Sequence, residues 1–158
     1  MVSAHDADQI GAARALFREY AANLGVDLSF QGFEAELDAL PGDYQAPGGA
    51  LLLAQVEGEW AGCCALRPTH DTGFTDAAEM KRLYVRDVFR GFGLGRQLAE
   101  RILETATQLG YARVLLDTLD DMEAARALYA DLGFTEIPPY YDNPLPGAHY
   151  LMADLRQH

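Results

Sequence analysis

The sequence predicts an α/β or α+β fold in which helices flank a mixed central sheet. The first observation is the stretch 79–118, which reads as strand, glycine-rich loop, amphipathic helix and buried strand. The second is the order of the other elements: two helices and a hairpin come before this stretch, and a helix and two strands follow it. The third is the length of 158 residues, which suits one domain, so we expect a single domain over residues 1–158.

Apolar periodicity places each element along the chain. In order, it predicts helices over residues 6–25 and 33–40, strands over 50–56, 60–66 and 77–85, a helix over 94–109, a strand over 112–118, a helix over 122–132, and strands over 134–137 and 148–155. Asp6 with Gln9, and Asp120 with Glu123, have the spacing of N-terminal capping boxes. Only residues 1–3 precede the first helix, so we expect a first strand that is short or missing.

The strand over residues 77–85 has an irregular apolar pattern. Met80, Leu83 and Val85 are spaced by three and then two positions, whereas one face of a regular strand repeats every two. One extra residue near Lys81 and Arg82 therefore predicts a β-bulge. A regular strand with one exposed polar pair fits the pattern equally well.

The composition argues against nucleic-acid and membrane partners. The net charge is −12, with 24 acidic and 12 basic residues, and the sequence shows no basic stripe that would neutralise phosphates or anionic lipids. An acidic surface concentrates cationic small molecules, although the same charge also serves solubility alone. Cys63 and Cys64 are adjacent on a predicted strand and poorly placed to pair with each other. With no signal peptide or transmembrane run in the sequence, we expect a cytoplasmic protein with free thiols.

A glycine-rich turn connects the irregular strand to the long helix. Residues 90–96 read Arg-Gly-Phe-Gly-Leu-Gly-Arg, and the helix carries apolar residues on one face at positions 94, 98, 102, 106 and 109 before Gly110 ends it. Free N–H groups and the helix dipole at such an N-terminus bind phosphate. The glycine spacing does not match a dinucleotide fingerprint, and the only lysine, Lys81, lies outside the loop, which excludes a nucleotide P-loop. A glycine turn without a ligand is the alternative.

Two motifs resemble the GNAT superfamily of N-acetyltransferases. Arg90, Gly93 and Gly95 follow the Arg-x-x-Gly-x-Gly pattern of motif A, whose loop holds the pyrophosphate of acetyl-coenzyme A. One strand later, the pattern Ala-x-x-Leu-Tyr-x-x-Leu-Gly-Phe of motif B is matched by Ala125, Leu128, Tyr129, Leu132, Gly133 and Phe134. The resemblance is clear over residues 79–134 and weaker on both sides, where residues 140–155 look like the ending of many bacterial members.

The resemblance implies the GNAT fold, with one strand splayed from its neighbour, and acetyl-coenzyme A as cosubstrate without a metal. In this superfamily the main chain of the splayed strand pairs with the pantetheine arm. The residues that would bind the cosubstrate here are Leu83, Val85, Arg90, Gly91, Phe92, Gly93, Leu94, Gly95 and Arg96. Met122 departs from the family pattern, because many members carry an asparagine there that contacts the cosubstrate.

The resemblance also implies direct transfer, in which an amine attacks the thioester carbonyl and coenzyme A leaves as a thiolate. Tyr129 stands where many members use a tyrosine to protonate that thiolate, although a core tyrosine fits the same helix face. Glu79 matches the catalytic glutamate of histone-type members and is expected as the base. A solvated glutamate at a strand end is the alternative reading, and Asp117 is the second candidate. The N–H of Val85 would donate to the developing oxyanion.

The acceptor is expected to be an amine of a small molecule or an exposed amine of a protein. Its pocket is expected to include His149, Tyr150 and the variable segments 31–49, 67–76 and 138–147. The acidic side chains of these segments, which would suit a cationic acceptor, are Glu34, Glu36, Asp38, Asp43, Asp71, Asp76 and Asp142. The sequence leaves the oligomeric state open, and the resemblance makes a homodimer one possibility, since family members are often homodimers. The alternative functions are a non-catalytic acyl-coenzyme A sensor of the same fold and a structural module whose loop binds nothing.

Overall fold

The computed structural model describes residues 1–25, 32–45, 47–69, 72–120, 122–141, 143 and 145–157. The strands are β1 (Val2–Ser3), β2 (Ala50–Val56), β3 (Glu59–Pro68), β4 (Ala77–Val85), β5 (Arg113–Leu119), β6 (Thr135–Ile137) and β7 (Ala148–Asp154). The helices are α1 (Ala7–Leu24), α2 (Phe33–Ala39), α3 (Leu94–Gln108) and α4 (Glu123–Asp131), with short 3-10 helices at Asp87–Phe89 and Leu155–Gln157. The predicted element order is confirmed, and the first strand is short, with only two residues.

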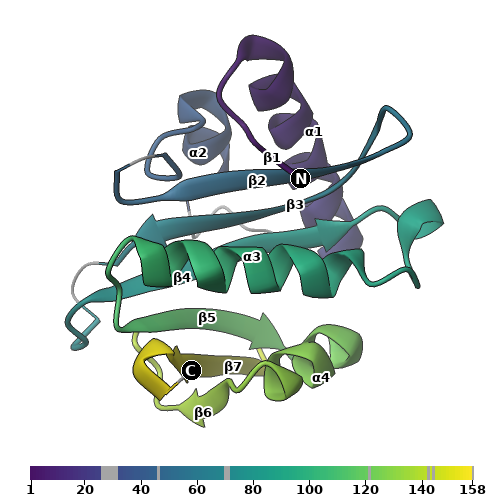
Figure 1. Ribbon diagram of the computed structural model, residues 1–158. Helices are drawn as coiled ribbons and strands as arrows, with labels where there is room; N and C mark the ends of the chain where they lie inside the picture. Colours follow the sequence, from purple (N-terminus) through teal and green to yellow (C-terminus); the bar gives the residue numbers. More distant parts are fainter. Residues whose placement is uncertain are drawn as a thin grey trace.

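The seven strands form one sheet in the order β1-β2-β3-β4-β5-β7-β6 (Figure 1). β4 and β5 pair in parallel, and the other neighbouring strands pair antiparallel, so the sheet is mixed as predicted. Among the helices of the described residues, none combines the length and the apolar character needed to cross a membrane.

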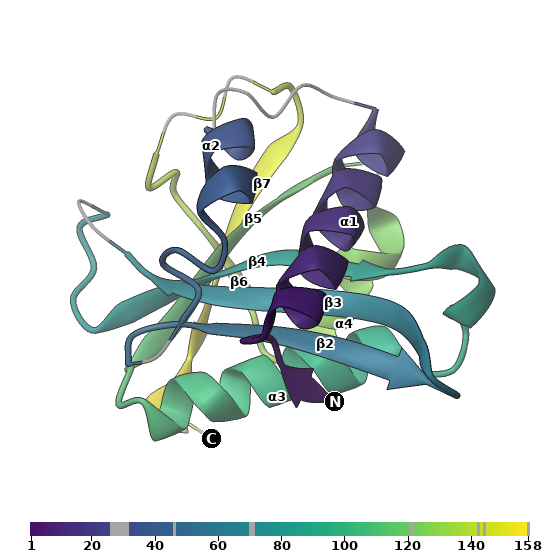
Figure 2. The same ribbon diagram turned by 90° about the horizontal axis from the view of Figure 1, so that it is seen from above.

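Helices cover both faces of the sheet. Figure 2 shows α1 and α2 on one face and α3 on the other. The core beneath α1 and α2 contains Phe17 and Cys63, whereas the core beneath α3 and α4 contains Ile102, Tyr129 and Cys64. The two cysteines therefore point to opposite faces, and both are free thiols, as the sequence predicted.

Local signals explain where α1 begins and ends. Asp6 and Gln9 form the predicted capping box of α1, and Gly25 ends that helix in the left-handed conformation at φ 67°. The second predicted capping box is wrong. Met122 is the N-cap of α4, and among the described residues no side chain caps this helix. The carboxylate of Asp120 instead bonds to the imidazole of His149 on β7, so a tertiary partner replaces the local one.

The predicted bulge lies in β4. Tyr84 is opposite Cys63 and Lys81 is opposite Ala65, so three steps along β4 match two steps along β3. Arg82, at φ 62°, lies within this irregularity.

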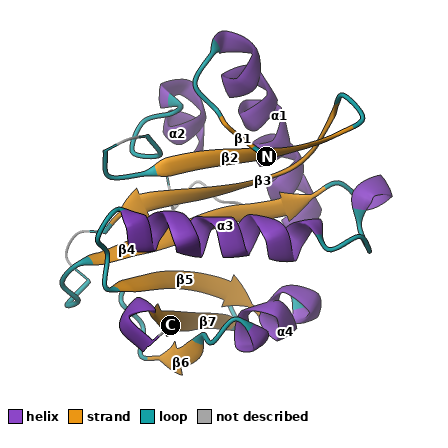
Figure 3. Ribbon diagram, in the orientation of Figure 1, coloured by secondary structure: helices purple, strands orange, loops and turns teal. Residues whose placement is uncertain are grey.

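The sheet opens on the other side of β4. Its ladder with β5 runs only from Ala77–Arg113 to Glu79–Leu115. Beyond that point the two strands diverge (Figure 1 and Figure 3). The splay implied by the family resemblance is therefore present.

Candidate active site

The glycine loop after β4 leads directly into α3. Gly91 and Gly93 have φ values of 89° and 80°, a region that favours glycine, and Gly93 is the N-cap of the helix. Among the described residues no side chain caps α3, and its first turn carries no acidic residue. The N–H groups at this helix start therefore have no side-chain acceptor in the described structure, which is the arrangement that binds phosphate.

An open cleft of about 650 Å³ runs along this loop and the splayed part of β4. Its lining includes seven of the expected cosubstrate residues, namely Leu83, Val85, Arg90, Gly91, Gly93, Leu94 and Gly95. Phe92 is not in the lining and is 75% exposed, and Arg96 lies outside the lining as well. Met122 does line the cleft, so the position of the missing asparagine faces the same space.

The two arginines of the loop have protein partners. Arg90 donates from Nε to the carbonyl oxygen of Val85 at 2.8 Å and pairs with Asp87 at 2.7 Å. Arg96 pairs with Asp131 at 2.9 Å. Both ion pairs are exposed and contribute about 0–1 kcal/mol each, so exchange for a phosphate has a low cost.

The hydrogen bond from Arg90 also fixes the orientation of the β4 backbone. The carbonyl of Val85 points away from β3, while the N–H of the next residue, Arg86, bonds to Ala61 of β3 at 2.8 Å. Because the N–H and C=O of one strand residue point to the same side, the N–H of Val85 also faces the cleft.

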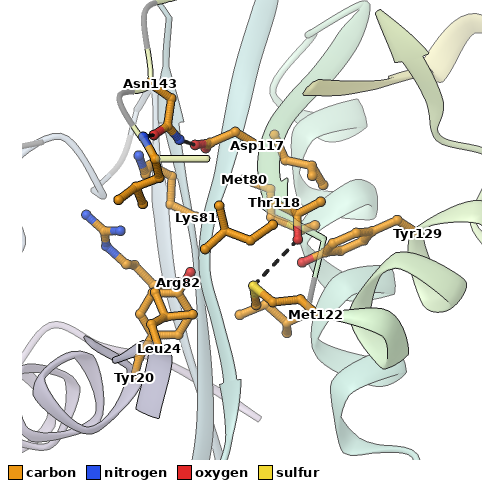
Figure 4. Close-up of a pocket in the computed structure, with 14 residues that line it drawn as sticks. Tyr20, Leu24, Met80, Lys81, Arg82, Asp117, Thr118, Met122, Tyr129 and Asn143 are labelled. Atoms are coloured by element: carbon orange, nitrogen blue, oxygen red, sulfur yellow. Dashed lines mark hydrogen bonds between the residues drawn. The ribbon is translucent and has the colours of Figure 1, made fainter. Parts of the chain in front are cut away.

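A smaller cavity of about 40 Å³ lies deeper, between the diverging strands. It shares Tyr20, Leu24, Leu83 and Met122 with the cleft, so the two spaces are adjacent. Figure 4 shows the side chains that enter it from β4, β5, α1 and α4. Its polar lining comprises Lys81, Arg82, Asp117, Thr118, Tyr129 and Asn143, in addition to Tyr20. Thr118 donates to the sulfur of Met122 at 3.6 Å.

Tyr129 is placed at this cavity by α4. The residue is 6% exposed, its ring packs edge-on against Phe134 with centroids 5.6 Å apart, and it also lines the cavity. Burial raises the pKa of its hydroxyl well above the usual value, so the group stays protonated at neutral pH. The core role and the proton-donor role weighed from the sequence are therefore compatible in one side chain.

Glu79 is held by other residues beside the cavity. It is 3% exposed, and its carboxylate accepts from Arg67 at 2.8 Å and from the hydroxyl of Tyr140 at 2.8 Å. Burial alone would raise its pKa, but Lys81, Arg67 and these hydrogen bonds outweigh burial and lower it. The carboxylate lines neither the cleft nor the cavity among the described residues, so it is placed less favourably for a base than expected.

Asp117 reaches the cavity from β5, near the end of that strand. Its carboxylate accepts from Asn143 at 2.9 Å and from the hydroxyl of Tyr141. Tyr150, which was expected in the acceptor pocket, packs edge-on against Tyr141 and lines a neighbouring surface pocket. His149 lies elsewhere, because its ring contacts Asp120 and Glu136.

Several cavity residues were not predicted as site residues from the sequence, including Tyr20, Thr118 and the adjacent pair Lys81 and Arg82. Alternation along a regular strand sends such neighbours to opposite faces, but the bulge brings both to the cavity. The spacing of Met80, Leu83 and Val85 was the available signal, since it predicted the bulge at this pair.

The acidic residues expected to attract a cationic acceptor do not line the described cavity. Glu36 pairs with Arg82 at 3.0 Å, and the exposed residues are Glu34, Asp38, Asp43 and Asp76. Asp71 and Asp142 lie outside the described residues. Within the described part of the chain, no group of three or more His, Cys, Asp or Glu side chains is arranged to hold a metal ion.

Comparison with known proteins identifies relatives over most of the chain. A family model described as Acetyltransferase (GNAT) family matches residues 13–134. An uncharacterised N-acetyltransferase of Schizosaccharomyces pombe is 40% identical over 141 residues, which cover 89% of this chain and 85% of that protein.

Solved structures share the fold. A GNAT-family acetyltransferase from Staphylococcus aureus superposes with a TM-score of 0.77 at 18% identity, over 96% of each chain. A GNAT-family acetyltransferase from Elizabethkingia anophelis with acetyl-CoA bound has a TM-score of 0.55 at 23% identity, over 68% of this chain and 76% of that one.

Proposed function

The chain belongs to the GNAT family of acetyltransferases, and from that membership we propose that it acetylates an amine of a small molecule or an exposed protein amine, with Tyr129 as proton donor. The observation that carries the proposal is that the open cleft lies next to an inner cavity that Tyr129 lines, with four lining residues in common. A cosubstrate lying in the cleft would thus present its reactive end to a buried, protonated hydroxyl.

Acetyl-coenzyme A, which the family uses, fits the cleft. The helix start of α3 and the left-handed glycines Gly91 and Gly93 offer N–H donors for a pyrophosphate. The opened main chain of Leu83 and Val85 supports pairing with a pantetheine arm. When bound, acetyl-coenzyme A supplies the activated acyl thioester.

The residues of the chain would divide the proton transfers between them. Tyr129 holds a proton for the leaving sulfur, and the N–H of Val85 faces the space in which an oxyanion would develop. For removal of a proton from the acceptor amine, the geometry supports Asp117 over Glu79. Asp117 lines the cavity, whereas Glu79 lies outside it with a lowered pKa.

The cosubstrate site is tested with two matched glycine variants. Gly93→Ala and Gly58→Ala each place a side chain at φ near 80° with nothing within 4 Å of the new Cβ, so both have a similar backbone cost. Gly58 lies in the hairpin turn, away from the cleft. In calorimetric titrations with acetyl-coenzyme A, we expect weaker binding for Gly93→Ala only. Equal affinities for wild type and both variants would refute the loop assignment.

The catalytic roles are tested by turnover. Since general acid catalysis contributes about 10²–10⁴-fold, Tyr129→Phe should lower kcat about 100-fold or more while acetyl-coenzyme A still binds. Asp117→Asn should lower kcat more than Glu79→Gln, and the reverse order would restore Glu79 as the base. Binding of acetyl-coenzyme A without turnover on any amine would favour the sensor. A cytoplasmic location stays a prediction, and the oligomeric state stays open.

A further inference from the structure

Two neighbouring basic residues of β4 both reach the inner cavity. In a regular strand, Lys81 and Arg82 would point to opposite faces of the sheet. The bulge removes this alternation, and both line the cavity although they are only 7% and 3% exposed. Figure 4 shows the two side chains on one side of the cavity, with Tyr129 on the other.

The carboxylates around this pair already accept hydrogen bonds from protein donors. Glu36 accepts from Arg82 at 3.0 and 3.1 Å, and it does not belong to the cavity lining. Asp117 accepts from Asn143 at 2.9 Å and from Tyr141. Glu36 thus balances the charge of Arg82, and the other fixed charges among the described residues of the lining are Lys81 and Asp117.

Burial works against the charge of Lys81. Burial is the largest influence on Lys81 and lowers its pKa, Glu79 and Asp117 raise it, Arg82 lowers it further, and the net shift is downward. The charged ammonium is thus disfavoured by its present surroundings, and a further anion would favour it. Arg82 is also in the left-handed region at φ 62°, a strained conformation for a residue with a side chain, and such strain clusters at functional sites.

We propose that the acceptor is a small amine that also carries a carboxylate, as an amino acid does, and that Lys81 and Arg82 bind this carboxylate. The inference rests on the proposed function, because it places the amine on the Tyr129 side of the cavity and the carboxylate on the opposite side. An ammonium and a guanidinium are suited to bind a carboxylate by charge-assisted hydrogen bonds. The proposal replaces the cationic acceptor expected from the sequence, since the described acidic residues behind that expectation do not line the cavity.

The test compares acceptors that differ at the carboxylate. Coenzyme A release gives kcat/KM for a panel of L-amino acids, their amides and their decarboxylated amines. For each protein, kcat/KM for the acid is divided by kcat/KM for its amide, which gives the acid-to-amide ratio. Dividing the ratio for wild type by the ratio for Lys81→Met cancels the intrinsic reactivity of each amine. We expect wild type to favour the acid and Lys81→Met to lower the ratio about tenfold or more. Lys81→Arg should retain part of the preference, and Arg101→Gln, which removes an exposed charge on α3, should leave it unchanged.

A second readout does not depend on turnover. Lys81 is the only lysine of the chain, so an amine-reactive reagent reports on its side chain through one labelled peptide in a mass spectrum. With coenzyme A present, N-acetyl amino acids, which carry no competing amine, should slow this labelling, and their amides should not.

The two readouts separate the possible failures. If no amine is acetylated, the proposed function fails, and the labelling result still decides whether the carboxylate site exists. Equal protection by acid and amide overturns the carboxylate site, and so does an acid-to-amide ratio that Lys81→Met leaves unchanged.

Discussion

The buried ion pair between Glu36 of α2 and Arg82 of β4 is expected to make a large contribution to the free energy of unfolding. The side chains of Arg82 and Glu36 are 2% and 12% exposed, and the Glu36 carboxylate accepts two hydrogen bonds from Arg82 and one from Tyr44. Glu36→Gln keeps the size of the side chain but leaves the guanidinium buried without its counter-charge. Breaking a buried pair in this way lowers the free energy of unfolding by about 3–5 kcal/mol.

Urea unfolding at neutral pH measures this loss as a decrease of the transition midpoint. The melting temperature should fall by about 6–20 °C, because about 1 kcal/mol corresponds to roughly 2–4 °C in a chain of this size. The matched control is Asp131→Asn, which breaks the pair with Arg96 whose side chains are 66% and 45% exposed. That change should lower the unfolding free energy by about 0–1 kcal/mol. If Glu36→Gln and the control lower the unfolding free energy by the same small amount, Glu36 does not stabilise the buried charge of Arg82. That result would refute the reasoning.

Two further predictions concern the strand pair near the cleft and the edge of the sheet. Gly62→Ala would place a Cβ 2.5 Å from the carbonyl oxygen of Tyr84 and 3.3 Å from Cα of Val85, so we expect a loss of about 1–3 kcal/mol in urea unfolding and weaker acetyl-coenzyme A binding. Unchanged stability would show that the β3–β4 contact is looser than described. Hydrogen bonds from Asp120 and Glu136 raise the pKa of His149, so its contribution to stability is full below the unfolded pKa of about 6.5 and is lost as pH rises through the folded pKa. The stability difference between wild type and His149→Gln should therefore be larger at pH 6 than at pH 9, and a difference that grows with pH would contradict this assignment.

The sequence predicted most of the fold because local patterns and tertiary packing agree along the chain. The capping box of α1, the glycine that ends it and the irregular spacing in β4 each correspond to a local geometry. Where the local pattern and the tertiary packing disagree, the prediction from the sequence failed. Asp120 has a good capping position, but its carboxylate bonds to His149 instead. Leu109 continues the apolar face of α3 by spacing, yet it follows the last helical residue and is 39% exposed.

The site was predicted less completely because its parts come from distant segments. The motifs located the glycine loop and Tyr129, since each lies on a continuous stretch of chain. The environment of Glu79 depends on Arg67 and Tyr140, which are far from it in sequence, and no periodicity reports such contacts. A carboxylate at the right position along the chain is therefore weak evidence for a base until its partners are known.

The bulge at Arg82 connects the two halves of the site. Before it, Ala78 and Met80 face the core beneath α3, whereas after it Leu83 and Val85 do. The extra residue therefore changes which alternate positions face α3, and it brings Val85 to within 3.9 Å of an ideal Cβ at Gly95, at the start of that helix. Without it, Leu83 and Val85 would point toward α1 and α2, and the main chain facing the cleft would shift by one residue. Arg82, the residue inserted at this point, is itself a cation that lines the inner cavity. The register of β4 along the cleft and the charge of the inner cavity therefore depend on the same position.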